Sequence, residues 1–556
     1  MNKYNYERLG VMIDMSRNAV MSVEALKDYL TVLKKMGYNS VMLYTEDTYE
    51  VEGEPFFGYM RGRYSISELR ELDDFAYSIG IELIPCIQTL AHLGTITRWG
   101  KTPMDMGPVL LTDDERTYEF IENMFKTIRS CFRTNVIHIG MDEAHDLGRG
   151  RHLDIHGFEP TIDIIKRHLN RVCEIAKKYG LEPLMWSDMF FRSWNRGGYW
   201  GLDKLDMPKE VCDSVPEGVA QVYWDYYNES EEHYRFMIEN HKELSDNIWF
   251  AGGVWTWRGF LPNNRFSISS MKSAVSACQK CGIKNIFMTM WGDDGAECSR
   301  YSVLPALFYI GQIMQGNHNE ESIKAKFQKS FGIDFDDFIT LDLPNFIHRD
   351  YNGHVWGEKV DDTKSSFNGY PELAAKTALY SDSFTGYRDV LVKDGHGKEF
   401  AKYSKNLKAI AKKSKKWAYL FEEAAKLCDV LEYKYELGVK TRNAYLSDDK
   451  AELLRLANED YSIVINRTKV FYSAFKKLWF KENKPHGFEI QDIRLGGLIM
   501  RTASCKQRLI DYAHEKISSI PELEEDMLEL DTNGFMKLDR IYNQNDYSKI
   551  SSVNVF

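Results

Sequence analysis

The sequence predicts an α/β fold, a (β/α)8 TIM barrel followed by an all-α C-terminal domain. Two observations carry this prediction. Short β-rich runs alternate with amphipathic helical stretches over the first ~315 residues, and after about residue 318 the strand signal stops. Eight such β-then-α units are typical of a closed parallel barrel. We therefore expect a barrel over residues 1–318 and an α-helical domain over residues 319–556.

The runs rich in β-branched and aromatic residues are the predicted strands. They lie at Gly10–Met15, Ser40–Thr45, Glu82–Ile87, Asn135–Asp142, Pro183–Ser187, Ala220–Trp224, Trp249–Val254 and Asn285–Trp291. Amphipathic stretches between them predict helices near Val23–Met36, Ser67–Ile79, Asp114–Cys131, Thr161–Tyr179, Glu231–Leu244, Ile268–Cys281 and Ser299–Met314. Several of these helices end at a Gly suited to a C-terminal cap. Right-handed crossovers then bring every strand's carboxyl end to one mouth of the barrel.

Composition narrows the class of protein. The 556 residues are 44% hydrophobic and 28% charged, which is globular, and the formal net charge of −11 argues against a nucleic-acid partner. No apolar run precedes the first strand and no stretch approaches the ~20 apolar residues of a membrane helix, so we expect neither a signal peptide nor a membrane partner. The nine scattered Cys suggest a reduced interior, and hence a cytoplasmic protein.

One predicted strand ends in two carboxylates. In Val136–Glu143, alternation along the strand puts His138, Gly140 and Asp142 on the face that points into the barrel. Glu143 falls at the strand's end, where it can turn across the mouth. Because unpaired buried carboxylates are penalised, this pair indicates a use, although a solvated turn is the alternative for an isolated Asp-Glu pair.

Other predicted strands end in aromatic and acidic residues. The carboxyl ends contribute Trp186 with Asp188, Trp224 with Asp225 and Tyr226, Trp255 with Trp257, and Trp291 with Asp293. Catalytic groups of barrel enzymes come from these ends. Indole faces stack on the C–H faces of a pyranose, and carboxylates accept bonds from its hydroxyls, so the pattern favours a sugar ligand. The alternative is that the Trp residues cap the barrel as core.

The acidic segment also resembles a known motif. His138–Glu143 is similar to the His-x-Gly-x-Asp-Glu signature of family 20 glycoside hydrolases, the β-N-acetylhexosaminidases. Leu9–Arg17 looks like that family's first strand, and Pro85–His92 matches the spacing of its Pro-x-Ile-Asp-x-Pro-Gly-His segment. The resemblance covers roughly residues 5 to 315. It implies a retaining exo-β-N-acetylhexosaminidase that acts on N-acetylhexosamine-terminated glycans, and we expect no cofactor. His152 and His156 lack a third ligand, so we also predict no metal.

The resemblance also implies roles for individual residues. Glu143 would be the general acid and then the base, while Asp142 would hold the N–H of the substrate's 2-acetamido group, whose oxygen is the nucleophile. The remaining implied substrate-binding residues are Arg8, His92, Trp186, Trp224, Asp225, Tyr226, Trp257, Trp291 and Asp293. His92, with Glu46 or Asp47, is a candidate relay to Glu143, and a core His bonded to a backbone carbonyl is the alternative.

Some positions depart from the family pattern. Arg8 stands one residue before the place of the family's sugar-binding Arg, and Gln88 replaces an Asp. The family's Tyr of strand seven has no match, and Tyr226 or Tyr227 could substitute for it. The β domain that commonly precedes the barrel is missing, which points to a divergent intracellular branch.

Two alternatives to the family's reaction stay open. One is a retaining β-glycosidase that uses two protein carboxylates, such as Glu143 and Asp293, and the other is a non-catalytic sugar-binding barrel. After the barrel, a homodimer through the C-terminal helices is possible on the sequence alone. The turn-rich segment Lys484–Arg494 is either a connector between helices or a contributor to the barrel mouth.

Overall fold

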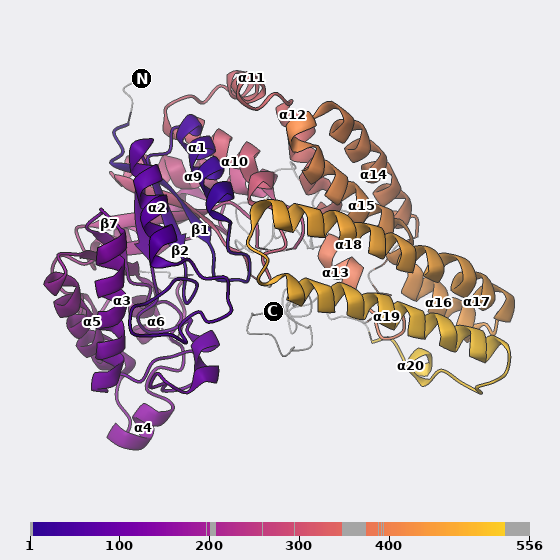
Figure 1. Ribbon diagram of the computed structural model, residues 1–556, viewed down its shortest axis with the longest axis horizontal. Helices are drawn as coiled ribbons and strands as arrows, with labels where there is room; N and C mark the ends of the chain where they lie inside the picture. The colour runs from indigo at the N-terminus through magenta and orange to yellow at the C-terminus, as the bar shows by residue number, and fades with distance from the viewer. Residues whose placement is uncertain are drawn as a thin grey trace.

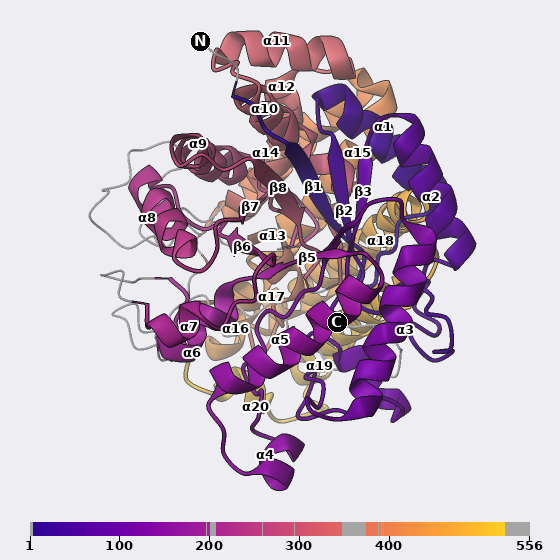
Figure 2. The same cartoon turned by 90° about the vertical axis from the view of Figure 1, so that its left-hand side faces the viewer.

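The computed structural model confirms the predicted fold class. It describes residues 4–195, 197–200, 207–257, 259–293, 295–346, 374–386, 389, 390, 392 and 394–528. Eight parallel strands form a closed barrel in chain order. They are β1 (Arg8–Asp14), β2 (Ser40–Tyr44), β3 (Glu82–Cys86), β4 (Val136–His138), β5 (Glu182–Trp186), β6 (Ala220–Trp224), β7 (Ile248–Gly253) and β8 (Asn285–Met290). Pairing of β1 with β8, with Met12 opposite Thr289, closes the ring (Figure 2).

Helices surround the barrel, as the sequence predicts. The main ones are α1 (Val23–Met36), α2 (Ile66–Ser78), α3 (Glu115–Cys131), α5 (Thr161–Lys178), α8 (Glu231–Lys242), α9 (Asn264–Lys280) and α10 (Leu304–Met314). Short helices α4 (Arg151–His156), α6 (Asp188–Trp194) and α7 (Lys209–Cys212) lie in the links beside β4, β5 and β6. Local sequence explains the boundaries: Ser22 caps α1 by accepting from the Ala25 N–H, and Gly37 ends it with a φ of 96°.

The prediction for the fourth strand is wrong after His138. Gly140 and Met141 have φ angles of 73° and 72°, so the chain leaves the extended conformation two residues before the end of the predicted run. The expected alternation of faces therefore stops before Asp142. The residues that follow form a turn, and this turn carries Asp142 and Glu143 into the mouth of the barrel.

The remainder of the described chain is helical. The elements are α11 (Glu320–Phe331), α12 (Phe335–Phe338), α13 (Ala374–Tyr380), α14 (His396–Lys413), α15 (Ala418–Lys434), α16 (Leu437–Leu446), α17 (Lys450–Leu456), α18 (Ser462–Glu482), α19 (Phe488–Ala513) and α20 (Pro521–Glu524). Helices α14 to α19 extend away to one side of the barrel (Figure 1). The boundary between residues 318 and 319 remains a prediction.

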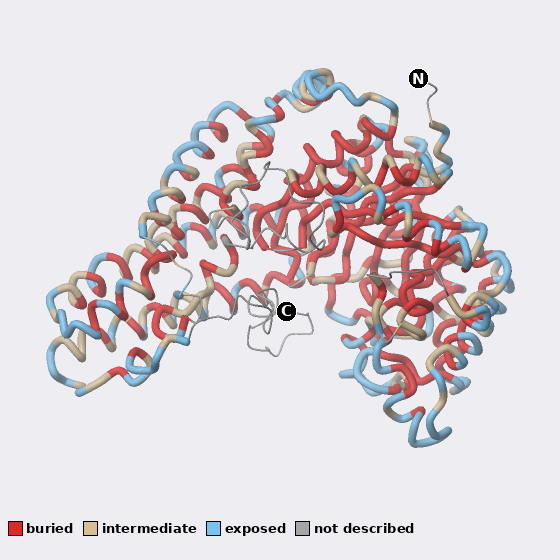
Figure 3. Tube along the Cα trace, turned by 180° about the vertical axis from the view of Figure 1, so that it is seen from behind, coloured by how far each residue is buried: buried red, intermediate tan, exposed pale blue. Residues whose placement is uncertain are grey.

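Burial is concentrated in the barrel and along the inner faces of the C-terminal helices (Figure 3). On the inner faces of α14 and α15, Leu407, Phe421 and Leu431 are buried. Among the described residues, no helix is both long and apolar enough to cross a membrane.

Two carboxyls are buried together between α15 and the end of α18. Burial and then the neighbouring Glu482 raise the pKa of Glu423, and burial raises the pKa of Glu482 to about 6 despite bonds from Ser299 and Tyr419. An acid whose pKa rises on folding stabilises the fold below its unfolded pKa and loses that contribution as pH rises through the folded pKa. For Glu482, a shift from 4.5 to about 6 corresponds to about 2 kcal/mol.

Glu423→Gln is therefore expected to raise the melting temperature at pH 8 and to change it little at pH 5, because the glutamine resembles the protonated carboxyl that the fold prefers. Differential scanning calorimetry at the two pH values measures the difference. Glu422→Gln, at the exposed neighbouring position, is the matched control. An equal shift at both pH values would contradict the assignment.

Candidate functional site

A polar pocket opens at the carboxyl ends of the barrel strands. It holds about 560 Å³ of space, part of it open to solvent. Residues from the ends of β2, β5 and β6 and from the loops after β1, β3, β4, β6, β7 and β8 meet there. The lining residues are Arg17, Tyr44, His92, Asp142, Glu143, Trp186, Trp224, Tyr226, Tyr227, Trp257, Trp291 and Asp293. The structure thus brings together nine of the eleven predicted site residues.

The turn after β4 is fixed by Gln88. Its side-chain oxygen accepts from the Met141 N–H at 3.1 Å, so its amide nitrogen is the donor, and this nitrogen bonds Asp142 Oδ1 at 2.8 Å and the Tyr44 hydroxyl at 3.0 Å. A Cβ at position 140 would lie 2.0 Å from Gln88 Oε1, so only glycine fits there. Gln88, which stands where the family has an Asp, therefore orients Asp142.

Asp142 and the half-buried His92 form a charge pair. His92 Nε2 lies 3.2 Å from Asp142 Oδ2 and 3.7 Å from Glu143 Oε2. Although burial opposes charge on both groups, His92 and Gln88 hold the pKa of Asp142 below its usual range, and Asp142 holds the pKa of His92 above its own. Asp142 is therefore ionised and His92 protonated near neutral pH.

The pKa of Glu143 is shifted in the opposite direction to that of Asp142. Burial, then the charges of Asp142 and Asp188, raise its pKa to about 7. Asp188, the first residue of α6, accepts from the Glu143 N–H at 3.2 Å and from Arg192 Nε at 2.9 Å. Arg192 Nη2 lies 3.7 Å from Glu143 Oε1. The pKa values of the two adjacent carboxyls are thus shifted in opposite directions. This arrangement lets one carboxyl act as a proton donor while the other stays charged.

Asp188→Asn is expected to lower the pKa of Glu143 and so to move the alkaline limb of the pH profile of kcat/KM down by about one pH unit. The substitution removes one negative charge and leaves Arg192 facing Glu143. Rate measurements between pH 5 and 9 test this, with the exposed Asp154→Asn as control. An unchanged alkaline limb would show that Asp188 does not influence Glu143.

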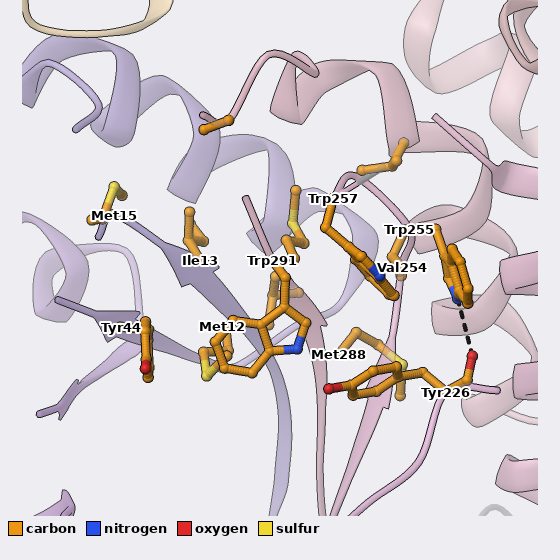
Figure 4. Packing of buried hydrophobic residues seen from close by; sticks show 14 of the residues in the cluster. Met12, Ile13, Met15, Tyr44, Tyr226, Val254, Trp255, Trp257, Met288 and Trp291 are labelled. Atoms are coloured by element: carbon orange, nitrogen blue, oxygen red, sulfur yellow. Dashed lines mark hydrogen bonds between the residues drawn. The ribbon is translucent and has the colours of Figure 1, made fainter. Parts of the chain in front are cut away.

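Aromatic side chains form the pocket walls, as predicted. The Trp186 and Trp291 rings lie 6.0 Å apart, and Tyr226 stacks on Trp224 at 5.7 Å and meets Trp257 edge-on at 5.2 Å. Figure 4 shows Trp291, Tyr226 and Trp257 grouped together, with the Trp255 indole bonded behind them to the Tyr226 carbonyl at 3.0 Å. Both tyrosines proposed for the missing strand-seven Tyr, 226 and 227, line the pocket.

The prediction for Arg8 is wrong in position. Arg8 lies at the amino end of β1, about 20 Å along the strand from its carboxyl end, and pairs with Glu82 at 2.6 Å. Arg17, three residues beyond the strand, takes its place in the pocket. Its guanidinium lies 2.9 Å from Glu46 and 3.9 Å from Asp293.

Asp225 is the second predicted site residue that does not line the pocket, because it lies behind the pocket wall. Its carboxylate accepts from the Tyr227 N–H, the Tyr223 hydroxyl and the Asn228 amide, and it is fully buried. It therefore shapes the turn that presents Tyr226 and Tyr227 and does not line the cavity. Glu46 and Asp47 were the two candidate partners of His92 in a proton relay. Asp47 pairs with Arg61, whereas the charge of Glu46 helps to raise the pKa of His92.

Three side chains of the pocket, among the residues that the structure describes, are close enough together to hold a metal ion. The side-chain donors of His92, Asp142 and Glu143 lie within 4.8 Å of one another. Because His92 and Asp142 already pair, proton chemistry explains the cluster, and the absence of a metal stays a prediction.

Sequence reasoning left Arg17, Tyr44 and the Asp188–Arg192 pair without a role. A signal existed for Arg17, which follows the end of the first predicted strand, but the comparison of motif spacing favoured Arg8.

Comparisons with known proteins point to one family of glycoside hydrolases. Residues 6–196 match the family model of the glycosyl hydrolase family 20 catalytic domain, and residues 357–542 match that of the glycoside hydrolase 20C C-terminal domain. Hexosaminidase D of Homo sapiens is 22% identical over 353 residues, which are 57% of this chain and 68% of that protein. Hexosaminidase D of Bos taurus is 23% identical over 347 residues, 55% of this chain and 92% of that protein.

Solved structures are similar at lower identity. An exo-β-N-acetylglucosaminidase of Vibrio harveyi is 15% identical with a TM-score of 0.46, over 61% of this chain. The match spans 58% of that chain's length, less than two thirds. A β-N-acetylhexosaminidase of Streptomyces coelicolor is 16% identical with a TM-score of 0.43, over 59% of this chain and 70% of that one.

Proposed function

Because the chain belongs to glycoside hydrolase family 20, we propose that it is a retaining exo-β-N-acetylhexosaminidase that removes terminal β-linked GlcNAc or GalNAc. One observation carries the proposal most strongly. Adjacent carboxyls, Asp142 and Glu143, have pKa values displaced in opposite directions at the floor of an aromatic pocket. This supports one group that keeps its charge and one that gives up and takes back a proton near neutral pH.

In the proposed first step, the 2-acetamido oxygen attacks C1 as the glycosidic bond breaks. Glu143 donates its proton to the leaving oxygen, and Asp142 accepts a hydrogen bond from the acetamido N–H, which balances the positive charge of the oxazolinium ring. In the second step the Glu143 carboxylate takes a proton from water. The oxygen of that water bonds C1 and reopens the ring, so the β configuration is retained.

The sizes of the two contributions to the rate favour a nucleophile supplied by the substrate and an acid supplied by the protein. A well-aligned intramolecular nucleophile supplies roughly 7–11 kcal/mol, whereas acid catalysis supplies about 10²–10⁴-fold in rate. The main task of the protein is then to hold the acetamido group bent beneath C1. Trp186, Trp224 and Trp291 supply walls of the required shape, and Tyr226 or Tyr227 supplies a hydroxyl for the acetamido oxygen.

Sugar hydroxyls are proposed to bind where Arg17 and Asp293 line the pocket. Arg17 donates there and Asp293, whose side chain is 46% exposed, accepts. Asp14 supports both, because its Oδ2 lies 3.5 Å from Arg17 and accepts from the Gly292 N–H at 2.8 Å.

A panel of nitrophenyl β-glycosides with and without the 2-acetamido group tests the proposal. We expect cleavage of the N-acetylated sugars, no comparable cleavage of plain β-glucosides, and inhibition by a GlcNAc-thiazoline. Equal cleavage of both classes, with a covalent adduct from a 2-fluoro sugar, would instead establish a protein nucleophile. A protein that binds GlcNAc but cleaves nothing would be a sugar-binding barrel.

A further inference from the structure

We propose that the C-terminal helices α13 and α19 hold the hydroxyl-binding side of the pocket in place, through a buried ion cluster of Glu297, Lys376 and Arg494. These three would be positioning residues that act through the loop bearing Trp291 and Asp293. The effect that we expect on KM rests on the proposed function, whereas the effect that we expect on the structure of the loop does not.

The cluster is buried between the barrel and the helices. Glu297, from the loop after β8, accepts from Lys376 Nζ of α13 at 2.8 Å through both oxygens and from Arg494 Nη1 of α19 at 2.9 Å. The side chains of Glu297, Lys376 and Arg494 are 0%, 2% and 2% exposed. Buried charges are costly unless paired, so the three groups can hardly separate while the protein is folded.

The cluster acts on the segment that carries Asp293. Glu297 follows Asp293 by four residues, and between them the Gly295 carbonyl accepts from Gln491 of α19 at 3.4 Å. Gly295 has a φ of 115°, and a Cβ there would lie 2.9 Å from Arg494 and 3.0 Å from Gln491. The close approach of α19 thus fixes both the path of the loop and the residue type it needs.

Two more pocket loops rest on the same helices. The residue before α19, Gly487, packs against Asn18, which follows Arg17, and a Cβ on it would lie 2.5 Å from the Asn18 carbonyl oxygen. Lys484 donates its backbone N–H to the Val20 carbonyl at 2.7 Å. Gly259, two residues after Trp257, lies against Lys376. The segment Lys484–Arg494 is therefore more than a connector.

The arrangement separates two tasks. Asp142 and Glu143 stand on the loop after β4, fixed by Gln88 and Asp188, whereas Arg17, Trp257 and Asp293 stand on loops that the C-terminal helices support. Loosening the cluster should therefore weaken sugar binding while the proton-transfer groups stay in place.

Arg494→Lys tests this, because lysine keeps the buried charge but lacks the reach and the fork geometry of arginine. The matched control is Arg501→Lys, two turns further along α19, where Arg501 pairs with Asp382 at 2.7 and 3.0 Å within the C-terminal helices. Gln491→Ala, which removes only the bond to the Gly295 carbonyl, is the milder second variant if Arg494→Lys does not fold.

Two readouts are needed. We expect Arg494→Lys to raise KM for nitrophenyl-GlcNAc about fivefold with kcat within about twofold, as for the loss of uniform binding, and Arg501→Lys to leave both unchanged. Amide hydrogen exchange should accelerate in peptides covering residues 291–297 and not in those covering 141–147, whether or not the protein is active.

The outcomes separate the two proposals. If Arg494→Lys only lowers the melting temperature and leaves KM and the exchange of residues 291–297 unchanged, the cluster is merely structural and the inference is overturned. Unchanged KM and exchange in a folded Gln491→Ala variant would overturn it equally. If the wild-type protein cleaves no hexosaminide, the proposed function fails, while the exchange measurement still decides the role of the cluster.

Discussion

Glu143→Gln is expected to lower kcat on alkyl or oligosaccharide N-acetyl-β-hexosaminides by about 10³-fold, within the 10²–10⁴-fold that general acid catalysis provides. Glutamine keeps the shape of the side chain but has no proton to donate. Substrates with very acidic leaving groups, such as dinitrophenol, need little protonation, so their first step should be slowed far less. The size of the loss should therefore rise with the pKa of the leaving group.

Steady-state rates across a series of aryl and alkyl leaving groups measure this dependence. Glu174→Gln, an exposed position on α5, is the control and should keep full activity. The same loss for every leaving group would mean that Glu143 does not protonate the glycosidic oxygen. The raised pKa of Glu143, about 7, also predicts that wild-type activity declines above neutral pH, because the carboxyl must be protonated at the start of the reaction.

Strand and helix positions in the barrel could be predicted because periodicity reflects burial. Helix α1 begins and ends at the predicted residues, since Ser22 and Gly37 mark its ends in the sequence itself. The fourth strand could not be predicted to its end. Its alternation of apolar and polar residues continues through Met141, but tertiary contacts from Gln88 hold Gly140 and Met141 in left-handed conformations. Contacts between distant residues override the local pattern there.

The candidate site shows the same limit. Residues in the carboxyl-terminal motifs, such as Asp142, Trp186 and Trp291, were found because each follows a recognisable strand, and their roles stay predictions. Asp225 was misplaced because motif spacing does not tell which way a side chain turns after a strand ends. Arg8 was misplaced because the one-residue offset in the motif hid that it lies at the amino end of β1. Arg8 precedes the strand's buried stretch, and Asp225 folds back onto its own turn.

Interactions between the barrel and the C-terminal helices were beyond sequence reasoning altogether. Glu297 and Arg494 are separated by 197 positions, and nothing local marks either as one of a pair. The polar character of Lys484–Arg494 left two interpretations open, a connector between helices or a contributor to the barrel mouth, and named none of the contacts. The structure explains that character, because its polar groups bond Glu68 of α2 and the backbone and side chains of the loop after β8.

Asp142→Asn is expected to lower kcat on N-acetylated substrates by about 10²-fold or more, the scale of losing one preorganised charge that acts on the transition state. The pKa of Asp142 is held low by His92 and Gln88, so the residue is charged when the oxazolinium ring forms. Asparagine keeps the acceptor oxygen but lacks the negative charge. Asp146→Asn, exposed in the same loop, is the control.

The mechanism also dictates how this loss should divide between substrates and inhibitors. A GlcNAc-thiazoline resembles the cyclised intermediate, so the variant should bind it much more weakly, whereas binding of GlcNAc, which carries no developing charge, should change far less. Removal of the Asp142 charge should also lower the pKa of His92, whose charge it supports. If Asp142→Asn bound the thiazoline as tightly as the wild type does, Asp142 would not be the group that balances the ring's charge. The negative charge that balances the ring would then have to come from another carboxylate, and besides Glu143 the lining of the pocket holds Asp293.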